Sequence, residues 1–123
     1  MEFKIHSGDL AKAKTPCLIL GVFEKHKLSP AAEQIDQASD GALTALLRKG
    51  DISGQTGSCL VVYDLPGVAA ERVLLLGLGK RKEFDRDAYR KALGAALTRL
   101  GEIRVTRALC AVAQLIAGGD LYH

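Results

Sequence analysis

The residues that first suggest chemistry are the glycines and the lysine at positions 77–80, because glycine-rich turns before a lysine bind phosphate in many nucleotide-binding proteins. A P-loop requires a glycine five positions before the Gly-Lys pair, where this sequence has Leu74, and a serine or threonine after the lysine, where it has Arg81. The dinucleotide-binding fingerprint requires a third glycine, where Lys82 stands, and a helix that begins within the motif. Both patterns fail, and we expect these glycines to let a strand leave the sheet beneath a packed loop.

A second feature is a concentration of basic residues between positions 80 and 91. Six cations could meet phosphate or an acidic partner: Lys80, Arg81, Lys82, Arg86, Arg90 and Lys91. An ordinary solvated edge explains the same residues, and the net charge of +3 over the whole chain is only mildly basic. Both interpretations stay open at this stage.

The remaining polar residues do not combine into a recognisable catalytic or metal-binding pattern. The histidines lie in three separate segments without a cysteine or carboxylate at ligand spacing, and they are His6, His26 and His123. The serines at positions 53 and 58 follow no Gly-x-Ser-x-Gly pattern. Two carboxylate pairs, Asp36 with Asp40 and Asp85 with Asp87, are explained by helix caps and solvated faces. We therefore expect neither a catalytic residue nor a metal ligand in this chain.

The three cysteines, Cys17, Cys59 and Cys110, each lie within an apolar run. Their odd number, their wide spacing and the lack of a Cys-x-x-Cys pair predict reduced, buried thiols. A reactive cysteine would need an electropositive and accessible setting, which the flanking residues do not offer.

Composition predicts one ordinary globular domain. Hydrophobic residues make up 48% of the 123 residues and charged residues 25%, values that argue against a disordered protein. Residues 1–5 form too short an apolar stretch for a signal peptide, and Glu2 and Lys4 interrupt it. No run approaches the ~20 apolar residues of a membrane helix. We expect a cytoplasmic protein that has no membrane partner.

The element that must position these residues is the apolar segment 73–77. Its residues, from Val73 to Gly77, are too few for a globular helix. The segment shows no polar alternation, which implies cover on both faces, as in the centre of a parallel sheet. Further strands are expected at 2–6 near a sheet edge, at 17–23 in the interior, at 58–64 beside the 73–77 strand, and within 104–115.

Two helical regions connect these strands. Ser29 and Pro30 predict the cap and first position of a helix that ends at residues 48–50. The Ser-Asp-Gly sequence at 39–41 leaves two interpretations, one kinked helix or two short helices with Asp40 capping the second. Asp85 is expected to cap the other helix, and Gly101 to end it. Its expected apolar face comprises Tyr89, Ala92, Leu93, Ala96, Leu97 and Leu100. This helix, between the strands at 73–77 and 104–115, forms a βαβ unit with parallel strands, so the predicted fold class is α/β.

The order of short motifs resembles the amino-terminal domain of bacterial leucyl aminopeptidases, in the cytosol aminopeptidase family. The motifs are Met1-Glu-Phe3, Gly21-Val-Phe23, Leu28-Ser-Pro-Ala-Ala-Glu-Gln34, Ser39-Asp-Gly41, Ala45-Leu-Leu-Arg48 and Leu74-Leu-Leu-Gly-Leu-Gly-Lys80. Each motif is weak alone, but the ordered set is fairly specific. The resemblance implies a three-layer α/β fold, similar to macro domains, with a mixed, mostly parallel sheet flanked by helices.

The resemblance also implies a function for the longer protein. Members of this family are cytoplasmic peptidases that release amino-terminal residues, leucine preferred, with two divalent ions, zinc or manganese, and they assemble as homo-hexamers. Their metal ligands lie in a carboxy-terminal catalytic domain around an Asn-Thr-Asp-Ala-Glu-Gly-Arg motif, which this sequence lacks. Residues 1–123 are therefore expected to be a single, inactive accessory domain whose partners are its own catalytic domain and other subunits.

Two alternatives remain for the domain itself. Some bacterial relatives bind DNA, and the face carrying Lys80 to Lys91 is compatible with that role. A macro-like crevice could instead bind a nucleotide such as ADP-ribose.

Overall fold

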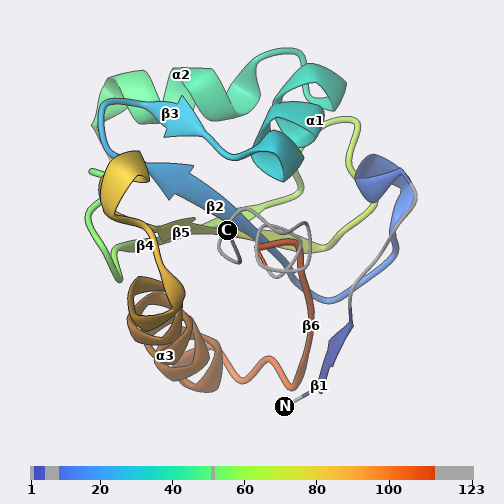
Figure 1. Cartoon of the computed structure of the whole chain (residues 1–123). Coiled ribbons are helices and arrows are strands. Elements are labelled where there is room, and N and C mark those ends of the chain that lie inside the picture. Colours follow the sequence, from blue (N-terminus) through green and yellow to red (C-terminus); the bar gives the residue numbers. More distant parts are fainter. Residues whose placement is uncertain (1, 5–8, 51, 113–123) are drawn as a thin grey trace.

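The computed structural model describes residues 2–4, 9–50 and 52–112 as a three-layer α/β structure. Figure 1 shows helices α1 and α2 above the sheet and helix α3 below it. The strands are β1 (Glu2–Lys4), β2 (Leu18–Phe23), β3 (Lys27–Leu28), β4 (Cys59–Tyr63), β5 (Arg72–Gly77) and β6 (Arg107–Cys110). The helices are α1 (Pro30–Ala38), α2 (Ala42–Lys49) and α3 (Arg86–Glu102), with single 3-10 turns η1 (Leu10–Lys12) and η2 (Arg81–Glu83).

The sheet is mixed and mostly parallel, as expected. Its order is β1-β6-β2-β5-β4, with the short β3 pairing antiparallel to β2. Strands β1, β6, β2 and β5 run parallel, and β4 runs antiparallel to β5. The βαβ unit is confirmed, because β5, α3 and β6 follow one another in the chain and both strands lie parallel on either side of β2.

Strand β5 is buried on both faces, as its apolar run predicts. Val73 and Leu75 pack into the core beneath α1 and α2, whereas Leu74 and Leu76 pack into the core above α3. All four side chains are fully buried. The middle strand, however, is β2 and not β5, since β5 has only β4 beyond it.

The first helical region consists of two helices. The Ser29 cap is confirmed, because its Oγ accepts a hydrogen bond from the Ala32 N–H at 3.3 Å. The predicted cap of the second helix by Asp40 is wrong. Gly41 occupies that position without a side-chain bond, and the Asp36 carboxylate accepts bonds from the N–H and hydroxyl of Thr44 at 2.9 and 2.6 Å.

Helix α3 begins as predicted and ends later than predicted. The Asp85 carboxylate accepts a hydrogen bond from the Ala88 N–H at 2.8 Å. The helix continues through Gly101 and ends where Arg104 adopts a left-handed conformation with φ of 58°. Leu97, which was assigned to the apolar face, is 36% exposed. The other predicted members are buried or half-buried.

Of the two terminal strands, β6 covers fewer of the described residues than expected. Within the expected strand at 2–6, the described part is β1, which lies at a sheet edge as predicted. Within 104–115 the strand is only β6, and residues 113–115 lie outside the described residues.

Candidate functional site

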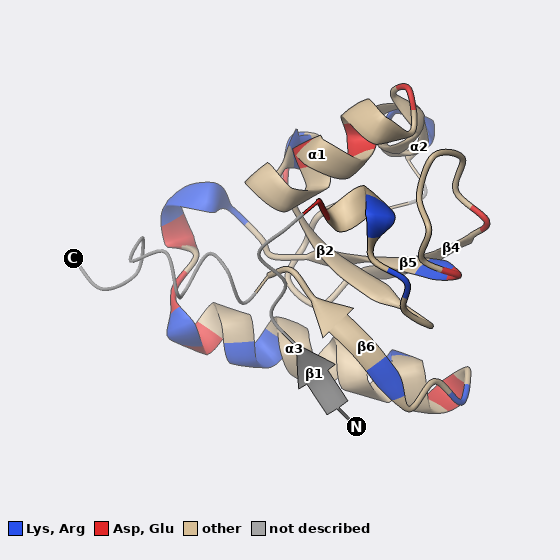
Figure 2. Cartoon of the chain, turned by 90° about the vertical axis from the view of Figure 1, so that its right-hand side faces the viewer, with Lys and Arg blue, Asp and Glu red and all other residues tan. Residues whose placement is uncertain are grey.

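The candidate site lies at the carboxyl ends of β2 and β5, where open α/β sheets commonly bind ligands. Three segments meet there: the turn after β2, the loop at residues 54–58, and residues 78–84 after β5. The candidate cations lie on η2, within the third segment, and on the first turns of α3, which comes next in the chain. Figure 2 shows basic and acidic segments alternating along this part of the chain.

The glycines of this edge serve close packing. A Cβ on Gly77 would collide with the Gln55 carbonyl oxygen and the Ser58 hydroxyl. Gly79 has a φ of 82°. Gly54 has a φ of 85°, and a Cβ on this residue would lie 2.5 Å from the Phe23 carbonyl oxygen. Side chains other than hydrogen do not fit here. The expectation that the strand leaves the sheet beneath a packed loop is therefore confirmed.

Several backbone amides of the same edge already have partners. The Glu24 N–H donates to the Gly79 carbonyl at 3.0 Å, and the Gly79 N–H donates to the Gly54 carbonyl at 2.8 Å. The Gly57 N–H likewise donates to the Gly77 carbonyl at 3.0 Å. A phosphate-binding loop needs such amides to point at the ligand. This geometry does not favour the nucleotide-binding alternative.

An aromatic pair packs the 3-10 turn η2 against the end of β2. The Phe23 and Phe84 rings pack edge to face, with centroids 5.7 Å apart. The guanidinium carbon of Arg81 lies 5.3 Å from the Phe23 ring centroid, a cation–π distance. Arg81 is thus held against the surface by a ring.

A shallow hollow of about 430 Å³ between η2 and α3 carries charges of both signs. Its charged lining is Glu24, Lys80, Glu83, Asp87 and Lys91. Lys80 and Glu83 form an ion pair at 3.9 Å, with both side chains about two-thirds exposed. Exposed pairs of this kind contribute about 0–1 kcal/mol. The hollow is therefore a mixed-charge surface and not a uniformly basic one.

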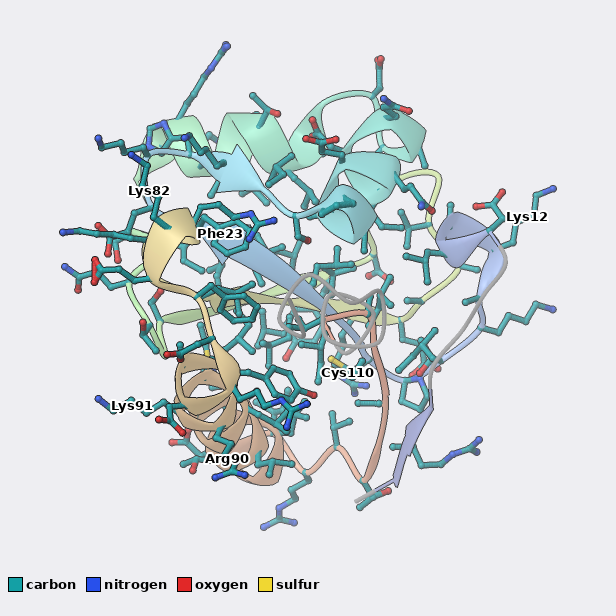
Figure 3. All side chains as sticks on the ribbon, viewed as in Figure 1. Lys12, Phe23, Lys82, Arg90, Lys91 and Cys110 are labelled. Atoms are coloured by element: carbon teal, nitrogen blue, oxygen red, sulfur yellow. The ribbon has the colours of Figure 1, made fainter. Side chains whose placement is uncertain are left out.

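The six candidate cations divide between η2 with its N-cap residue and the first two turns of α3. Arg81 and Lys82 lie on η2, and Lys80 is its N-cap residue. Arg86 and Arg90 lie four residues apart and share a stripe of α3, whereas Lys91 lies about 100° further round the helix and lines the mixed-charge hollow. Figure 3 shows Lys91 and Arg90 leaving α3 in different directions.

Two further cations, which the sequence analysis did not identify, lie beside the cations of η2. Lys25 and Lys27, in the turn between β2 and β3, line a second hollow together with Lys80, Arg81 and Lys82. Glu24 and Glu83 lie in the same hollow. The Glu-Lys-His-Lys sequence at 24–27 was a visible signal, but only the pairing of β2 with β5 places it beside residue 80.

The other candidate residues either form local structural hydrogen bonds, are exposed, or lie outside the residues that the structure describes. Ser58 donates a hydrogen bond to the Gln55 carbonyl at 2.7 Å, and Ser53 accepts one from the Gln55 N–H at 3.2 Å. Asp36 contacts Thr44 and not Asp40. His6 and His123 are outside the described residues, and His26 is exposed. Within residues 2–4, 9–50 and 52–112, no group of three or more His, Cys, Asp or Glu could hold a metal ion.

The three cysteines form no disulfide and are mostly buried. Cys17 and Cys110 are buried, and Cys59 is half-buried. Burial raises the pKa of Cys17 to about 11, although the nearby Arg72 charge and a backbone hydrogen bond oppose this effect. Burial also raises the pKa of Cys59, opposed by Arg99 and reinforced by Glu102. Raised pKa values leave little thiolate at neutral pH, so Cys17 and Cys59 do not have the features of nucleophiles. No helix of the described part is long and apolar enough to cross a membrane.

Comparison with known proteins finds relatives along nearly the whole chain. Residues 19–121 match the family described as "Cytosol aminopeptidase family, N-terminal domain". The chain is 42% identical to probable cytosol aminopeptidases of Aeromonas hydrophila and Tolumonas auensis and 41% identical to that of Vibrio campbellii, over 99% of its own length. It spans about a quarter of the length of these relatives, 24% in Aeromonas hydrophila.

The fold also matches a solved structure, the macrodomain of Mycobacterium tuberculosis DarG. The TM-score is 0.67 at 16% sequence identity, over 89% of this chain and 74% of that chain. At this identity the likeness concerns the fold alone. It confirms the expected macro-domain-like architecture.

Proposed function

The chain belongs to the cytosol aminopeptidase family, in which it forms the N-terminal domain, and from this membership we propose that it is the non-catalytic accessory domain of a two-metal leucyl aminopeptidase. The observation that supports the proposal is the share of each protein that the match covers. The match extends over 99% of this chain but only 24% of the Aeromonas hydrophila relative. The remaining three quarters of such a protein would hold the chemistry.

The described residues do not fit a pair of metal ions, because no group of potential ligands comes together in them. In two-metal hydrolases the ions activate water and polarise the scissile carbonyl. We assign no catalytic step to this chain and place metal binding, by zinc or manganese, outside it. The longer protein would be a cytoplasmic peptidase that acts on peptide amino termini.

The accessory domain would contribute packing and assembly. Its two cores on either side of one sheet make a stable body that can hold a fixed position against a catalytic domain and against other subunits of a homo-hexamer. The charged residues at the carboxyl ends of β2 and β5 would offer polar contacts to the catalytic domain or to another subunit.

The test separates the domain from the enzyme. We expect the 123-residue chain to release no p-nitroaniline from leucine p-nitroanilide with added Mn²⁺ or Zn²⁺. A chimera in which this chain replaces the N-terminal quarter of the Aeromonas hydrophila relative should hydrolyse the substrate and assemble like that relative. The relative without its N-terminal quarter is the control. Metal-dependent turnover by the 123 residues alone would refute the proposal.

A second candidate function is DNA binding by the η2 surface. The observation that favours it is the grouping of Lys25 and Lys27 with Lys80, Arg81 and Lys82. Phosphate contacts of these cations would release counterions, so the affinity should fall steeply with salt. We expect a Lys25→Ala/Lys82→Ala double variant to weaken binding of a fluorescent DNA duplex, whereas Lys49→Ala on α2 should not. A wild-type chain that binds no duplex at 20 mM salt would dispose of this candidate.

A further inference from the structure

The turn between β2 and β3 has a strained backbone. Its successive residues Lys25 and His26 both adopt the left-handed conformation, with φ of 64° and 59°. A lysine rarely occupies this region, because its Cβ comes too close to the backbone, and two successive residues do so even less often. Glycine would allow the same turn at a lower cost. Backbone strain is concentrated at functional sites, so a lysine at this position points to a task for its side chain.

The strained turn forms one wall of the hollow that it shares with η2, and the volume of this hollow is about 260 Å³. Residues 80–83 form the opposite wall. The two walls are fixed to each other, because the Glu24 N–H donates to the Gly79 carbonyl oxygen at 3.0 Å and the strands that lead into them, β2 and β5, are paired. The fold therefore sets how far apart the two walls lie.

Positive charge is in excess in this hollow. Its lining contains two carboxylates, Glu24 and Glu83, and five cations: Lys25, Lys27, Lys80, Arg81 and Lys82. Lys80 and Glu83 pair with each other at 3.9 Å. Within the part of the chain that the structure describes, Lys25, Lys27 and Lys82 form no ion pair. These three ammonium groups are therefore available to an anionic ligand.

The kinds of cation in the hollow favour phosphate over carboxylate. The planar fork of an arginine suits a carboxylate best, and the one arginine of the lining already stacks on the Phe23 ring. Lysine ammonium groups act as compact point charges, which suit phosphate oxygens. A chain of phosphates carries about one negative charge per group, so it brings several charges into a small volume.

We propose that this hollow binds a short chain of condensed phosphate groups, either a free polyphosphate or the tail of a nucleotide. Lys25 and Lys27 contact the chain from the strained turn, and Lys82 contacts it from η2. The site shares these cations with the second candidate function, but its ligand is small enough to enter the hollow. It does not depend on the proposed peptidase role.

A matched pair of double variants tests the site. Lys25→Gly/Lys82→Ala removes two of the contacting lysines. Lys12→Ala/Arg104→Gly removes the same charge, and it also replaces a left-handed cation by glycine, since Arg104 has a φ of 58°. Figure 3 shows Lys12 and Lys82 on opposite sides of the molecule, and Arg104 follows the end of α3 that lies away from η2.

Isothermal titration calorimetry of the 123-residue chain with sodium tripolyphosphate at 20 mM salt measures the affinity. We expect one site per chain and a loss of about ten-fold or more for Lys25→Gly/Lys82→Ala. The affinity of Lys12→Ala/Arg104→Gly should stay within about two-fold of the wild type, because its charges lie far from the hollow. Butanetetracarboxylate, which carries its charges on carboxylates, should bind about ten-fold more weakly than tripolyphosphate.

Adenosine triphosphate distinguishes the two sources of the phosphate chain. Tighter binding of this nucleotide than of tripolyphosphate assigns the site to a nucleotide tail, whereas binding that is no tighter assigns it to free polyphosphate. In both cases the amide NMR signals of residues 24–27 and 80–83 should shift.

The single variant Lys25→Gly separates the role of the side chain from a role in folding. Because glycine relieves the left-handed strain, this variant should melt no lower than the wild type, yet it should bind tripolyphosphate more weakly. Wild-type affinity in Lys25→Gly would contradict the proposed contact.

Three results overturn the proposal: no binding of tripolyphosphate by the wild type, equal binding of the tetracarboxylate, or equal losses of affinity in the two double variants. A chain that binds a DNA duplex but not tripolyphosphate also refutes it, and that result leaves the DNA-binding candidate in place.

Discussion

At the scale of single residues, the thiols show how burial controls chemistry. Cys17 is fully buried immediately before β2, in the core between the sheet and α3. Burial disfavours its thiolate more strongly than the Arg72 charge favours it, so the pKa rises from 9.0 to about 11. The apolar flanks of this cysteine in the sequence already predicted an unreactive thiol.

The raised pKa predicts a specific loss of stability at high pH. The unfolded chain loses the Cys17 proton near pH 9, but the folded chain keeps it to about pH 11. The unfolded state therefore binds fewer protons between these values, and stability falls as the pH rises through this window. The loss from this one group is about 2–3 kcal/mol. Below pH 9 its contribution is fully present.

Urea unfolding at pH 8, 9.5 and 11 measures this effect. Cys17→Ala should be less stable at pH 8 but should lose less stability on going to pH 11 than the wild type does. Val22→Ala, which also truncates a fully buried side chain, should keep the wild-type pH dependence. Parallel slopes for wild type and Cys17→Ala would show that this thiol does not titrate in the window.

At the scale of elements, the junction of α1 and α2 depends on one carboxylate. Gly41 begins α2 with a φ of 82° and offers no side chain to cap it. Asp36, in the last turns of α1, accepts the bonds from Thr44 that an N-cap side chain would otherwise accept. One side chain therefore links the last turn of α1 to the first turn of α2.

Replacing this carboxylate should cost as much as losing a helix cap. We expect Asp36→Ala to lower the free energy of unfolding by about 1–2 kcal/mol, because two bonds to Thr44 are lost. Asp36→Asn keeps an acceptor oxygen and should lose less. Gln37→Ala, at the exposed neighbouring position, serves as the control. Thermal unfolding followed by circular dichroism gives the comparison, and equal melting temperatures for Asp36→Ala and Gln37→Ala would exclude the bridging role.

At the scale of the whole molecule, β5 joins the two cores. Alternate side chains of this strand enter the core of α1 and α2 and the core of α3, so neither layer can separate without exposing it. Gly77 and Gly79, at the carboxyl end of β5, pack beneath the loop at 54–58, so this loop is also held in place by β5. The domain should therefore unfold as one unit.

A charge in β5 should remove this cooperativity. Leu75→Asp places a carboxylate in a fully buried position of the apolar core beneath α1 and α2, and we expect the sigmoidal urea transition to be lost. Leu97→Asp makes the same chemical change at a leucine that is 36% exposed and should stay close to wild type. A cooperative transition for Leu75→Asp near the wild-type midpoint would mean that this strand does not join the cores.

The sequence by itself determined the features that depend on neighbouring residues. The apolar runs of β2 and β5, the caps at Ser29 and Asp85, and the packed glycine exit follow from local sterics, hydrogen bonding and hydrophobic periodicity. The ordered motifs likewise carried the family resemblance, which the comparisons confirmed.

Only the tertiary structure decided which distant segments meet. The position of β2 in the middle of the sheet, the bond from Asp36 to Thr44, the separation of Arg90 from Lys91, and the grouping of Lys25 with Lys82 all depend on strand pairing and helix packing. Strand order is set by which apolar faces can be buried together in three dimensions, a property of the whole chain that no local pattern contains. The same reason applies to β4, which pairs only with β5 among the described strands, since the position of a strand in the sheet depends on how all the others pair.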